Sequence, residues 1–382
     1  MANRLSVVEA TTSSNSVVFD VLPFAKQYKM GVIQLNRPDS LNSLTLPMIQ
    51  AIYTQLEEWA MDQTVVAIWL EGAGGKAFCA GGNVVDVYHS LGEERDTSYC
   101  EQFFREEYAL DYLLHRFSKP VICWGSGYVM GGGMGLMMAS NYRIVTEKSR
   151  LSMPEISIGL YPDVGASYFL NQLEDDAIAR FLALTAYQVN ATDACEIGLA
   201  THYLMEQDCA ELKQQLMMAQ MADLNPEKVT LIIEQALFTL SQSDDLPLLK
   251  PELTALSPTV VSLMNGDIHN IYASMLAYSP ECPAMIKAKN TFLTGSPLSA
   301  HIIVQQLEWA KHQTLESVFA RELELSVSCC KQGDFFEGVR ALLVDKDKRP
   351  KWQYGRISEV LEDKVQILLG NQKLIDAVDA KG

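Results

Sequence analysis

The stretch PVICWGSGYVMGGGMG, residues 120–135, joins a short apolar run to a series of glycines. Residues 120–124 have the apolar, partly β-branched content typical of a buried strand. The glycines at 131–133 lie just before the apolar segment LMMASNY, which we interpret as a helix. The first N–H groups of a helix lack partners within it and lie at the positive end of its dipole, so glycines there leave them open to an oxyanion or a phosphate. Close packing of that helix onto a sheet would explain the same glycines, and their spacing fits neither common nucleotide-loop pattern.

The sequence on either side alternates between strand-like and helix-like segments. Residues 30–35, 65–70 and 142–146 are short apolar runs that predict strands, whereas residues 45–59 and about 98–117 have helical spacing. This alternation over the first 200 residues predicts an α/β layer architecture with loops at the strand ends available for chemistry. From about residue 223 the pattern becomes helical. We therefore divide the chain into a flexible leader (1–16), an α/β core (17–225) and a mainly helical C-terminal region (226–382).

Composition limits the classes of partner. The chain has 382 residues and a formal net charge of −17, which argues against a nucleic-acid binder because such a protein needs basic surface to displace counterions. Eight cysteines without a C-x-x-C pair indicate reduced thiols, and no stretch has the roughly 20 apolar residues that a membrane span requires. The first residues do not resemble a signal peptide. We expect a cytoplasmic protein with no nucleic-acid or membrane partner.

Two further segments contain candidate functional groups. The loop GAGGKAFCAGGN, residues 72–83, follows a predicted strand, and its glycines would let backbone N–H groups approach a ligand. The segment MPEISIGLYPDVG, residues 153–165, holds Glu155 and Asp163 among apolar side chains and helix breakers. Buried carboxylates are unfavourable unless paired or used, for instance as a general base or a nucleophile. From composition alone, a flexible loop and two solvated acids remain equally acceptable interpretations.

Several motifs together resemble the crotonase, or enoyl-CoA hydratase/isomerase, superfamily. They are NRPDSLNSL (36–44), GGKAFCAGGN (74–83), MGGGMGL (130–136) and MPEISIGLYPDVG (153–165). FFREEY (103–108), residues 181–204 and DFFEGVRALLVDKDKRPKW (334–352) are similar to the branch that hydrolyses short 3-hydroxyacyl-CoA thioesters. The resemblance implies a spiral of β-β-α units followed by helices that cover the CoA site, mediate oligomerisation, or do both. The implied substrate is 3-hydroxyisobutyryl-CoA, from valine breakdown.

By this resemblance, the backbone N–H groups of Gly82 and Gly132 form the oxyanion hole for the thioester oxygen. Hydratases of the superfamily use two glutamates, and this chain has Gly135 where the first should lie. It keeps the second as Glu155 and adds Asp163, the pair expected of the hydrolase branch. Glu155 would attack the thioester or activate water, with Asp163 assisting.

The resemblance also implies substrate contacts. Glu107 is expected on the inward face of its helix, where it would bind the acyl hydroxyl, although a surface acid paired with Arg105 would fit the same spacing. The Ala80 backbone would lie along the adenine and pantetheine path. Candidate ligands for the CoA phosphates are Arg37, Lys76, Arg340, Lys346, Lys348, Arg349 and Lys351, although such basic clusters are more often solvated surface. CoA belongs to the substrate, so no separate cofactor is expected.

Other interpretations remain open at this point. Cys79 has no histidine near it in sequence, and we interpret it as a packed thiol rather than a nucleophile. The six histidines show no metal-binding spacing, so no metal is expected. An enoyl-CoA hydratase or isomerase is the main alternative activity, and a CoA-binding protein without activity is the second. A homo-oligomer, trimeric or hexameric, is expected from the superfamily.

Overall fold

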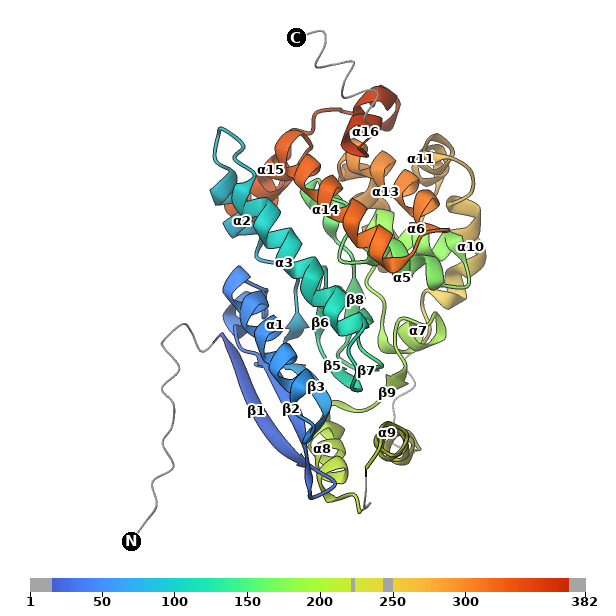
Figure 1. The fold of residues 1–382 in the computed structure, drawn as a ribbon. Helices are drawn as coiled ribbons and strands as arrows, with labels where there is room; N and C mark the ends of the chain where they lie inside the picture. Colours follow the sequence, from blue (N-terminus) through green and yellow to red (C-terminus); the bar gives the residue numbers. More distant parts are fainter. Residues whose placement is uncertain (1–15, 221–223, 243–249, 371–382) are drawn as a thin grey trace.

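A six-stranded sheet with the order β1-β2-β3-β5-β7-β9 organises the N-terminal half of the molecule (Figure 1). The structure is a computed structural model that describes residues 16–220, 224–242 and 250–370, so the expected leader lies outside the described residues apart from Ser16. β1 and β2 form an antiparallel pair, and the later neighbours are parallel. The strands are β1 (Val17–Phe24), β2 (Tyr28–Leu35), β3 (Val65–Gly72), β5 (Val121–Gly125), β7 (Tyr142–Val145) and β9 (His202–Tyr203).

A second, three-stranded parallel sheet stands beside the first. It contains β4 (Ala77–Cys79), β6 (Tyr128–Met130) and β8 (Arg150–Ser152). The chain visits the two sheets in turn, from β3 to β4, β5 to β6 and β7 to β8. α2 (Val84–Leu91) follows the first pair and α4 (Gly132–Met138) the second, whereas the third is followed by the 3-10 helix η2 (Glu155–Ile158). This is the expected spiral of β-β-α units, with an irregular third turn.

Helices cover both faces of the large sheet. On one face lie α1 (Leu46–Met61) and α3 (Ser98–His115), in one buried cluster with the apolar side chains of α1 at the predicted positions 49, 52, 56 and 59. On the other face, α8 (Cys209–Met218) and α9 (Pro226–Ser241) cover Trp69 and Trp124, whose rings stack with centroids 5.9 Å apart. A strand that is buried on both faces has apolar residues at every position rather than at every second one. This explains why β3 contains the run VVAIWL and β5 the run VICW.

Most of the remaining helices lie on the side of the molecule away from α8 and α9 (Figure 1), whereas α7 (Ala191–Glu196) contacts β9. α14 (Leu315–Gln332) lies along α3, and α15 (Phe335–Val339) contacts η2 and α2. A single buried cluster contains residues from β2 to α16. The other elements are η1 (Pro38–Ser40), α5 (Ala166–Phe169), η3 (Leu170–Gln172), α6 (Asp176–Thr185), α7 (Ala191–Glu196), η4 (Glu206–Asp208), η5 (Thr254–Leu256), α10 (Ser257–Leu263), α11 (Ile268–Ala277), α12 (Pro283–Thr294), α13 (Pro297–Ala310), the π-helix η6 (Arg340–Val344), η7 (Ile357–Glu359) and α16 (Glu362–Leu368).

The structure adds five strands that the sequence pattern did not indicate, namely β1, β4, β6, β8 and β9, and the last four have only two or three residues each. β1 is an edge strand, and its residues alternate between partly buried and exposed positions. Such a sequence pattern is a weaker strand signal than the continuous apolar runs of the inner strands. Among the described residues, no helix is both long enough and apolar enough to cross a membrane.

Candidate active site

A cavity of about 430 Å³ is lined by the segments that follow β2, β4, β6 and β8, by α3 and by η6. All six residues predicted for the site line it, namely Ala80, Gly82, Glu107, Gly132, Glu155 and Asp163. They come from the loop after β4, from α3, from the start of α4 and from the segment after β8. The spiral therefore brings together three turns that are far apart in sequence.

Gly82 and Gly132 form the two glycine turns of the cavity. Gly81 (φ +102°) and Gly131 (φ +49°) have positive φ, so a glycine suits each turn. An ideal Cβ built on Gly132 would lie only 3.3 Å from the Gly82 nitrogen, which shows that the turns meet. Within the described ranges, neither the Gly82 nor the Gly132 amide donates a backbone hydrogen bond, although the neighbouring Asn83 amide donates to the Leu44 carbonyl at 2.7 Å. Two N–H groups are thus available to one oxygen.

The Glu107 carboxylate lies against both glycines. Its Oε1 is 2.4 Å from an ideal Cβ on Gly132 and 3.2 Å from one on Gly82, so a side chain at either position would crowd it. Glu107 is buried on the inward face of α3, as predicted, and Oε1 is without a hydrogen-bond partner in the described structure. Burial is the main cause that raises the pKa of Glu107 well above its usual range, and the negative charge of Asp163 raises it further.

Glu155 and Asp163 reach the cavity from a single bent segment. Glu155 begins η2, and its Oε1 lies 3.0 Å from an ideal Cβ on Gly131. The Leu160 amide donates to the Glu155 carbonyl at 3.0 Å, and Gly159 has φ +70°, so the chain folds back toward Asp163. Burial and the charge of Asp163 raise the pKa of Glu155, and burial raises the pKa of Asp163 to about 6. Both acids are buried, as the functional interpretation required.

Asp111 is a further buried acid, which sequence reasoning missed. It lies one helical turn after Glu107 on α3, is 1% exposed, and its Oδ2 is without a hydrogen-bond partner in the described structure. That atom lies 2.7 Å from an ideal Cβ on Gly135, and Val164 Cβ lies 2.8 Å from the same point. Gly135 is the position where hydratases of the superfamily are expected to carry a glutamate. The Asp111 side chain of α3 occupies the space next to it, so a side chain at Gly135 would have no room.

Four side chains behind the cavity support Asp163, and their role was not predicted. The Tyr108 hydroxyl donates to Asp163 Oδ2 at 2.6 Å and lies 2.7 Å from Ser326 Oγ. The Tyr161 hydroxyl lies 2.9 Å from Ser326 Oγ. The Glu322 carboxylate accepts hydrogen bonds from the backbone N–H groups of residues 165 (2.8 Å) and 167 (3.2 Å). Tyr108 and Tyr161 lie in motifs that the sequence analysis singled out, whereas the signal for Ser326 and Glu322 was a serine and an acid on the apolar face of α14.

The pKa values of the buried acids are set by burial and by one another. In the described part of the chain, burial and neighbouring carboxyls raise the pKa values of Glu107, Asp111, Glu155 and Asp163, and no basic group is among the causes that shift them. Four ionised carboxylates in so small a volume would repel one another strongly, because burial weakens the screening by water. Several of them must therefore hold protons at neutral pH.

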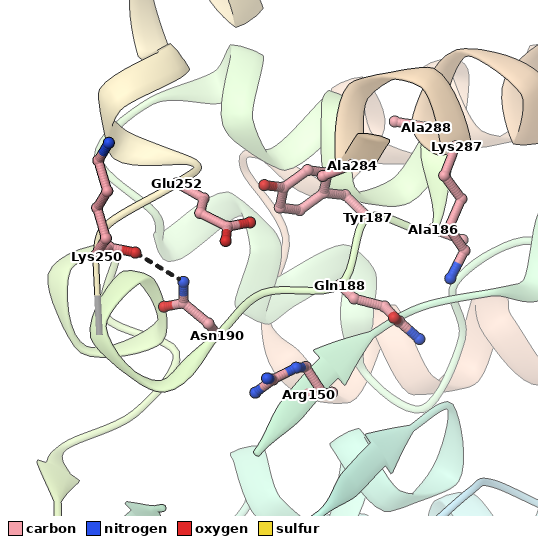
Figure 2. Close-up of a pocket in the computed structure, with 10 residues that line it drawn as sticks. All are labelled: Arg150, Ala186, Tyr187, Gln188, Asn190, Lys250, Glu252, Ala284, Lys287 and Ala288. Carbon is pink, nitrogen blue, oxygen red and sulfur yellow. Dashed lines mark hydrogen bonds between the residues drawn. The ribbon is translucent and has the colours of Figure 1, made fainter. Parts of the chain in front are cut away.

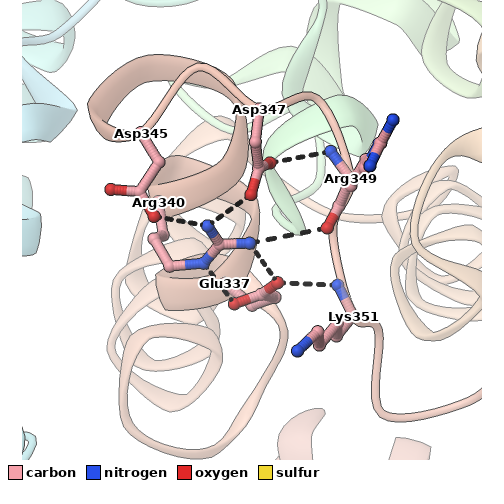
Figure 3. Close-up of polar contacts among 6 residues, drawn as sticks. All are labelled: Glu337, Arg340, Asp345, Asp347, Arg349 and Lys351. Carbon is pink, nitrogen blue, oxygen red and sulfur yellow. Dashed lines mark hydrogen bonds and ion pairs between the residues drawn. The ribbon is translucent and has the colours of Figure 1, made fainter.

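The structure changes the set of cations proposed for the CoA phosphates. Arg37 lines the cavity, but its guanidinium donates to the Ser43 carbonyl at 2.8 Å. Arg340 is engaged by three acids, Glu337, Asp345 and Asp347 (Figure 3). It holds the turn at 345–349 against η6, which carries Leu342 and Leu343 into the cavity wall. Its guanidinium is committed to these acids, so its assignment to a phosphate is wrong. The remaining candidates stay predictions, namely Lys76, Lys346, Lys348, Arg349 and Lys351.

Cys79 is a packed thiol, as interpreted from the sequence. It is fully buried, and burial raises its pKa to about 12, which leaves almost no thiolate at neutral pH. Among the described residues, no group of three or more His, Cys, Asp or Glu side chains could hold a metal ion.

A second hollow of about 240 Å³ lies between the start of β8 and α12 (Figure 2). It is lined by Arg150, Lys250 and Lys287, but their charged ends point in different directions in Figure 2, and Glu252 lies among them. None of the residues predicted for catalysis lines this hollow.

Curated relatives are similar over most of their length. A protein of Danio rerio is 35% identical over 94% of this chain and 91% of its own, and a human protein is 36% identical over 87% and 84%. Both are named 3-hydroxyisobutyryl-CoA hydrolase, mitochondrial. These names correct the expectation of a cytoplasmic protein and point to the mitochondrion. Reduced cysteines and the absence of a recognisable signal peptide could not have separated the two compartments.

Solved structures share the fold. A protein of Rhodobacter sphaeroides 2.4.1 described as an enoyl-CoA hydratase has a TM-score of 0.78 at 29% identity, covering 93% of this chain and 97% of its own. A carnitinyl-CoA dehydratase of Mycobacterium thermoresistibile has a TM-score of 0.80 at 30% identity, covering 94% and 97%. The predicted crotonase-like fold is therefore confirmed. Because the profile of the enoyl-CoA hydratase/isomerase family also matches residues 30–369, the chain belongs to that family.

Proposed function

We propose that this protein hydrolyses the thioester of 3-hydroxyisobutyryl-CoA to release the free acid and CoA. The observation that carries the proposal is the meeting of two uncommitted main-chain N–H groups, at Gly82 and Gly132, beside the buried acids Glu155 and Asp163. The names of relatives 34–37% identical to this chain support the same activity. An oxyanion hole facing carboxylates suits attack on a carbonyl carbon.

In this proposal, the thioester oxygen accepts hydrogen bonds from the Gly82 and Gly132 amides. Negative charge grows on that oxygen as the carbonyl carbon becomes tetrahedral, so the two donors bind the transition state more strongly than the substrate. Removing one such donor typically reduces kcat by roughly 100- to 1,000-fold. Because the site excludes much of the solvent, the donors need little reorganisation during the reaction.

Glu155 then has two possible roles. As a nucleophile it would form a mixed anhydride and expel the thiolate of CoA, and water would then open the anhydride. As a general base it would take a proton from water that attacks the thioester directly. Turnover in H₂¹⁸O separates the two, because attack of water on the Glu155 side of an anhydride leaves ¹⁸O in the protein. Mass spectrometry of the peptide that contains Glu155 would detect the label.

We assign Glu107 to the acyl group. Its unpartnered Oε1 lies between the two glycine turns, where a hydroxyl next to the thioester could reach it. A site built to hydrogen-bond a hydroxyl discriminates strongly against analogues without one, whereas a methyl group contributes only about 1–3 kcal/mol. We therefore expect acyl-CoA esters without a 3-hydroxyl to be hydrolysed far more slowly, and 3-hydroxypropionyl-CoA to remain a substrate.

Hydration of an enoyl-CoA is the second candidate, since a structural relative of similar size is described as an enoyl-CoA hydratase. The reaction would need a second acid near Glu155, and the position corresponding to the first hydratase glutamate is Gly135. The crowding of that position by Asp111 and Val164 makes the hydratase arrangement a poor fit.

The decisive experiment is a thiol-trapping assay on the purified protein. Hydrolysis of 3-hydroxyisobutyryl-CoA releases one thiol per turnover, whereas hydration consumes a conjugated double bond and releases none. Thiol release by the unaltered protein, together with its loss in the Glu155→Gln variant, supports the proposal. Loss of enoyl absorbance without thiol release would replace it with the hydratase activity, and CoA binding without turnover of any ester would leave a binding protein.

A further inference from the structure

The cavity that holds the proposed catalytic acids is closed at one end and open at the other. Glu107, Glu155 and Asp163 are buried, whereas Ser40 and Leu343, which also line it, are exposed. These two residues therefore mark the mouth of the cavity. A thioester bound at the closed end is followed in the CoA molecule by the pantetheine arm, and that arm must pass through the mouth to reach solvent.

The π-helix η6 forms one side of the mouth and carries Leu342 and Leu343 into the cavity lining. It continues directly from α15 as a widened turn, and such turns occur frequently at functional sites. η6 also contacts α2, whose first residues, Val84 and Val85, line the cavity as well. Four aliphatic side chains thus border the path of the arm, whose methylene and methyl groups suit an apolar surface.

Open space lies behind η6. A hollow of about 520 Å³ is lined there by Gly338, Ala341 and Leu342, together with residues of α12 and of the segment 348–352. Leu342 lines both this hollow and the cavity, so η6 is a partition between them. A core side chain is held by atoms packed around it on every side, and a partition with space on both sides lacks part of that support. Its position must therefore depend on other contacts.

Arg340 provides such contacts (Figure 3). Its guanidinium forms a two-pronged pair with Glu337, in which Nε donates to Oε2 at 2.9 Å and Nη2 to Oε1 at 2.8 Å. Nη1 donates to Asp345 and Asp347 in the turn that follows η6. Glu337 Oε1 also accepts the Lys351 amide at 2.7 Å. Most exposed ion pairs stabilise little, but a bidentate arginine within a network of several charges is the exception.

The turn after η6 depends on this network. Lys346 and Lys348 both have φ +57°, which side chains rarely adopt, and the Lys348 amide donates to the Ala341 carbonyl at 3.0 Å. Such a conformation persists only where surrounding contacts fix it. α15, by contrast, packs closely on η2, because an ideal Cβ on Gly338 would lie 2.2 Å from the Ile158 carbonyl carbon. Loss of the network should therefore free η6 and leave η2 with its catalytic acid in place.

We propose that Arg340 is a positioning residue for substrate binding, which holds η6 so that Leu342 and Leu343 contact the pantetheine arm of CoA at the cavity mouth. Arg340 acts through the two leucines and does not touch the ligand. This role rests on the proposed function for the identity of the ligand, a CoA thioester, and extends it to the part of CoA next to the sulfur.

Free CoA is the probe, because calorimetry measures its binding without turnover. Leu342→Ala together with Leu343→Ala should raise the CoA dissociation constant roughly 10-fold, the lower end of the discrimination that a hydrophobic pocket achieves. Arg340→Gln should raise it by a similar factor, since it releases the same two side chains. With saturating 3-hydroxyisobutyryl-CoA, kcat should change less than about twofold, because contacts made equally in the substrate and the transition state affect KM alone.

A double-mutant cycle separates positioning from direct contact with the ligand. If Arg340 acts through the leucines, adding Arg340→Gln to the two alanine substitutions should change the dissociation constant by less than about twofold. If the guanidinium bound a CoA phosphate, the two effects would multiply, and that result would overturn the proposal. Normal CoA binding by Arg340→Gln would overturn it as well.

Arg180→Gln is the matched control, because the Arg180 side chain is 20% exposed against 21% for Arg340, pairs with a glutamate and lies outside the cavity lining. Its CoA binding should equal that of the unaltered protein. Asp345→Asn together with Asp347→Asn breaks the same ties from the turn, and decides the matter if Arg340→Gln does not fold. Because these changes make the mouth more positive, weaker binding of anionic CoA would reflect the release of η6 rather than the change in charge.

The outcomes also separate this role from the proposed function. Weakened CoA binding in the Arg340 and aspartate variants of a protein that releases no thiol would uphold the role of Arg340 and overturn the proposed function. Thiol release by the unaltered protein, with CoA binding unchanged in these variants, would overturn the role of Arg340 alone.

Discussion

Substitution of Gly132 by alanine tests the oxyanion hole directly, because it adds a single methyl group where the thioester oxygen should lie. The new Cβ would be 2.4 Å from Glu107 Oε1 and 3.3 Å from the Gly82 nitrogen. Ordinary contacts begin at 3.4 Å, so the Glu107 oxygen must retreat by about 1 Å (3.4 minus 2.4). The main-chain donors themselves stay in place, since Gly132 does not have a positive φ.

The expected effect is large and specific to the chemical step. A methyl group beside the Gly82 amide displaces the substrate oxygen from both donors, and misplacement by about 1 Å can reduce the rate roughly 100-fold. Loss of one oxyanion donor costs about 2.7–4 kcal/mol of transition-state stabilisation. We therefore expect kcat to fall at least 100-fold in Gly132→Ala, with overpacking lowering the free energy of unfolding by about 1–3 kcal/mol.

The assay is thiol release under saturating 3-hydroxyisobutyryl-CoA, together with CoA binding by calorimetry and urea unfolding. Gly355→Ala is the matched control, because its Cβ would meet only Glu359 Oε2, at 3.2 Å on the exposed surface. Near-normal kcat in a folded Gly132→Ala variant would refute the position assigned to the thioester oxygen.

Four further predictions follow from the buried groups. Glu155→Gln should lower kcat by about 100- to 10,000-fold while leaving the CoA dissociation constant unchanged, and a parallel loss of both would contradict a catalytic role. The free energy of unfolding should fall as pH rises from about 4 to about 8, because burial raises the pKa of Asp163 to about 6 and of Glu322 to about 8, so the folded state binds more protons in that window. Asp111→Asn should flatten this dependence in urea unfolding at stepped pH, since the pKa of Asp111 is also raised by burial, and an unchanged slope would show that Asp111 does not titrate there. Cys79→Ala should keep its hydrolytic activity, because burial raises the thiol pKa to about 12, and loss of turnover with the fold intact would revive a nucleophilic cysteine.

The glycine turns and the acid segment could be read from the sequence because each is continuous in the chain. Gly132 begins a helix directly after a strand, and Glu155 and Asp163 are eight positions apart, so local pattern and family resemblance were enough to find them. The inward face of Glu107 followed from helical spacing in the same way.

The support behind these residues depends on contacts across the whole chain. Ser326 meets Tyr108 at a separation of 218 residues, and Glu322 meets the turn at 165 at a separation of 157, and no local pattern encodes either contact. Asp111 was overlooked because its burial results from α14 and α4 packing against α3. Arg340 was misassigned because its positive charge was considered without the acids at 337, 345 and 347 that surround it in space.

The most direct test of the central claim is a crystal structure with a non-hydrolysable ketone analogue of 3-hydroxyisobutyryl-CoA. We expect the analogue's carbonyl oxygen to lie about 2.7–3.1 Å from both the Gly82 and Gly132 nitrogens, with Glu155 and Asp163 facing the carbonyl carbon. A carbonyl oxygen bound elsewhere, or acids turned away from that carbon, would contradict the account.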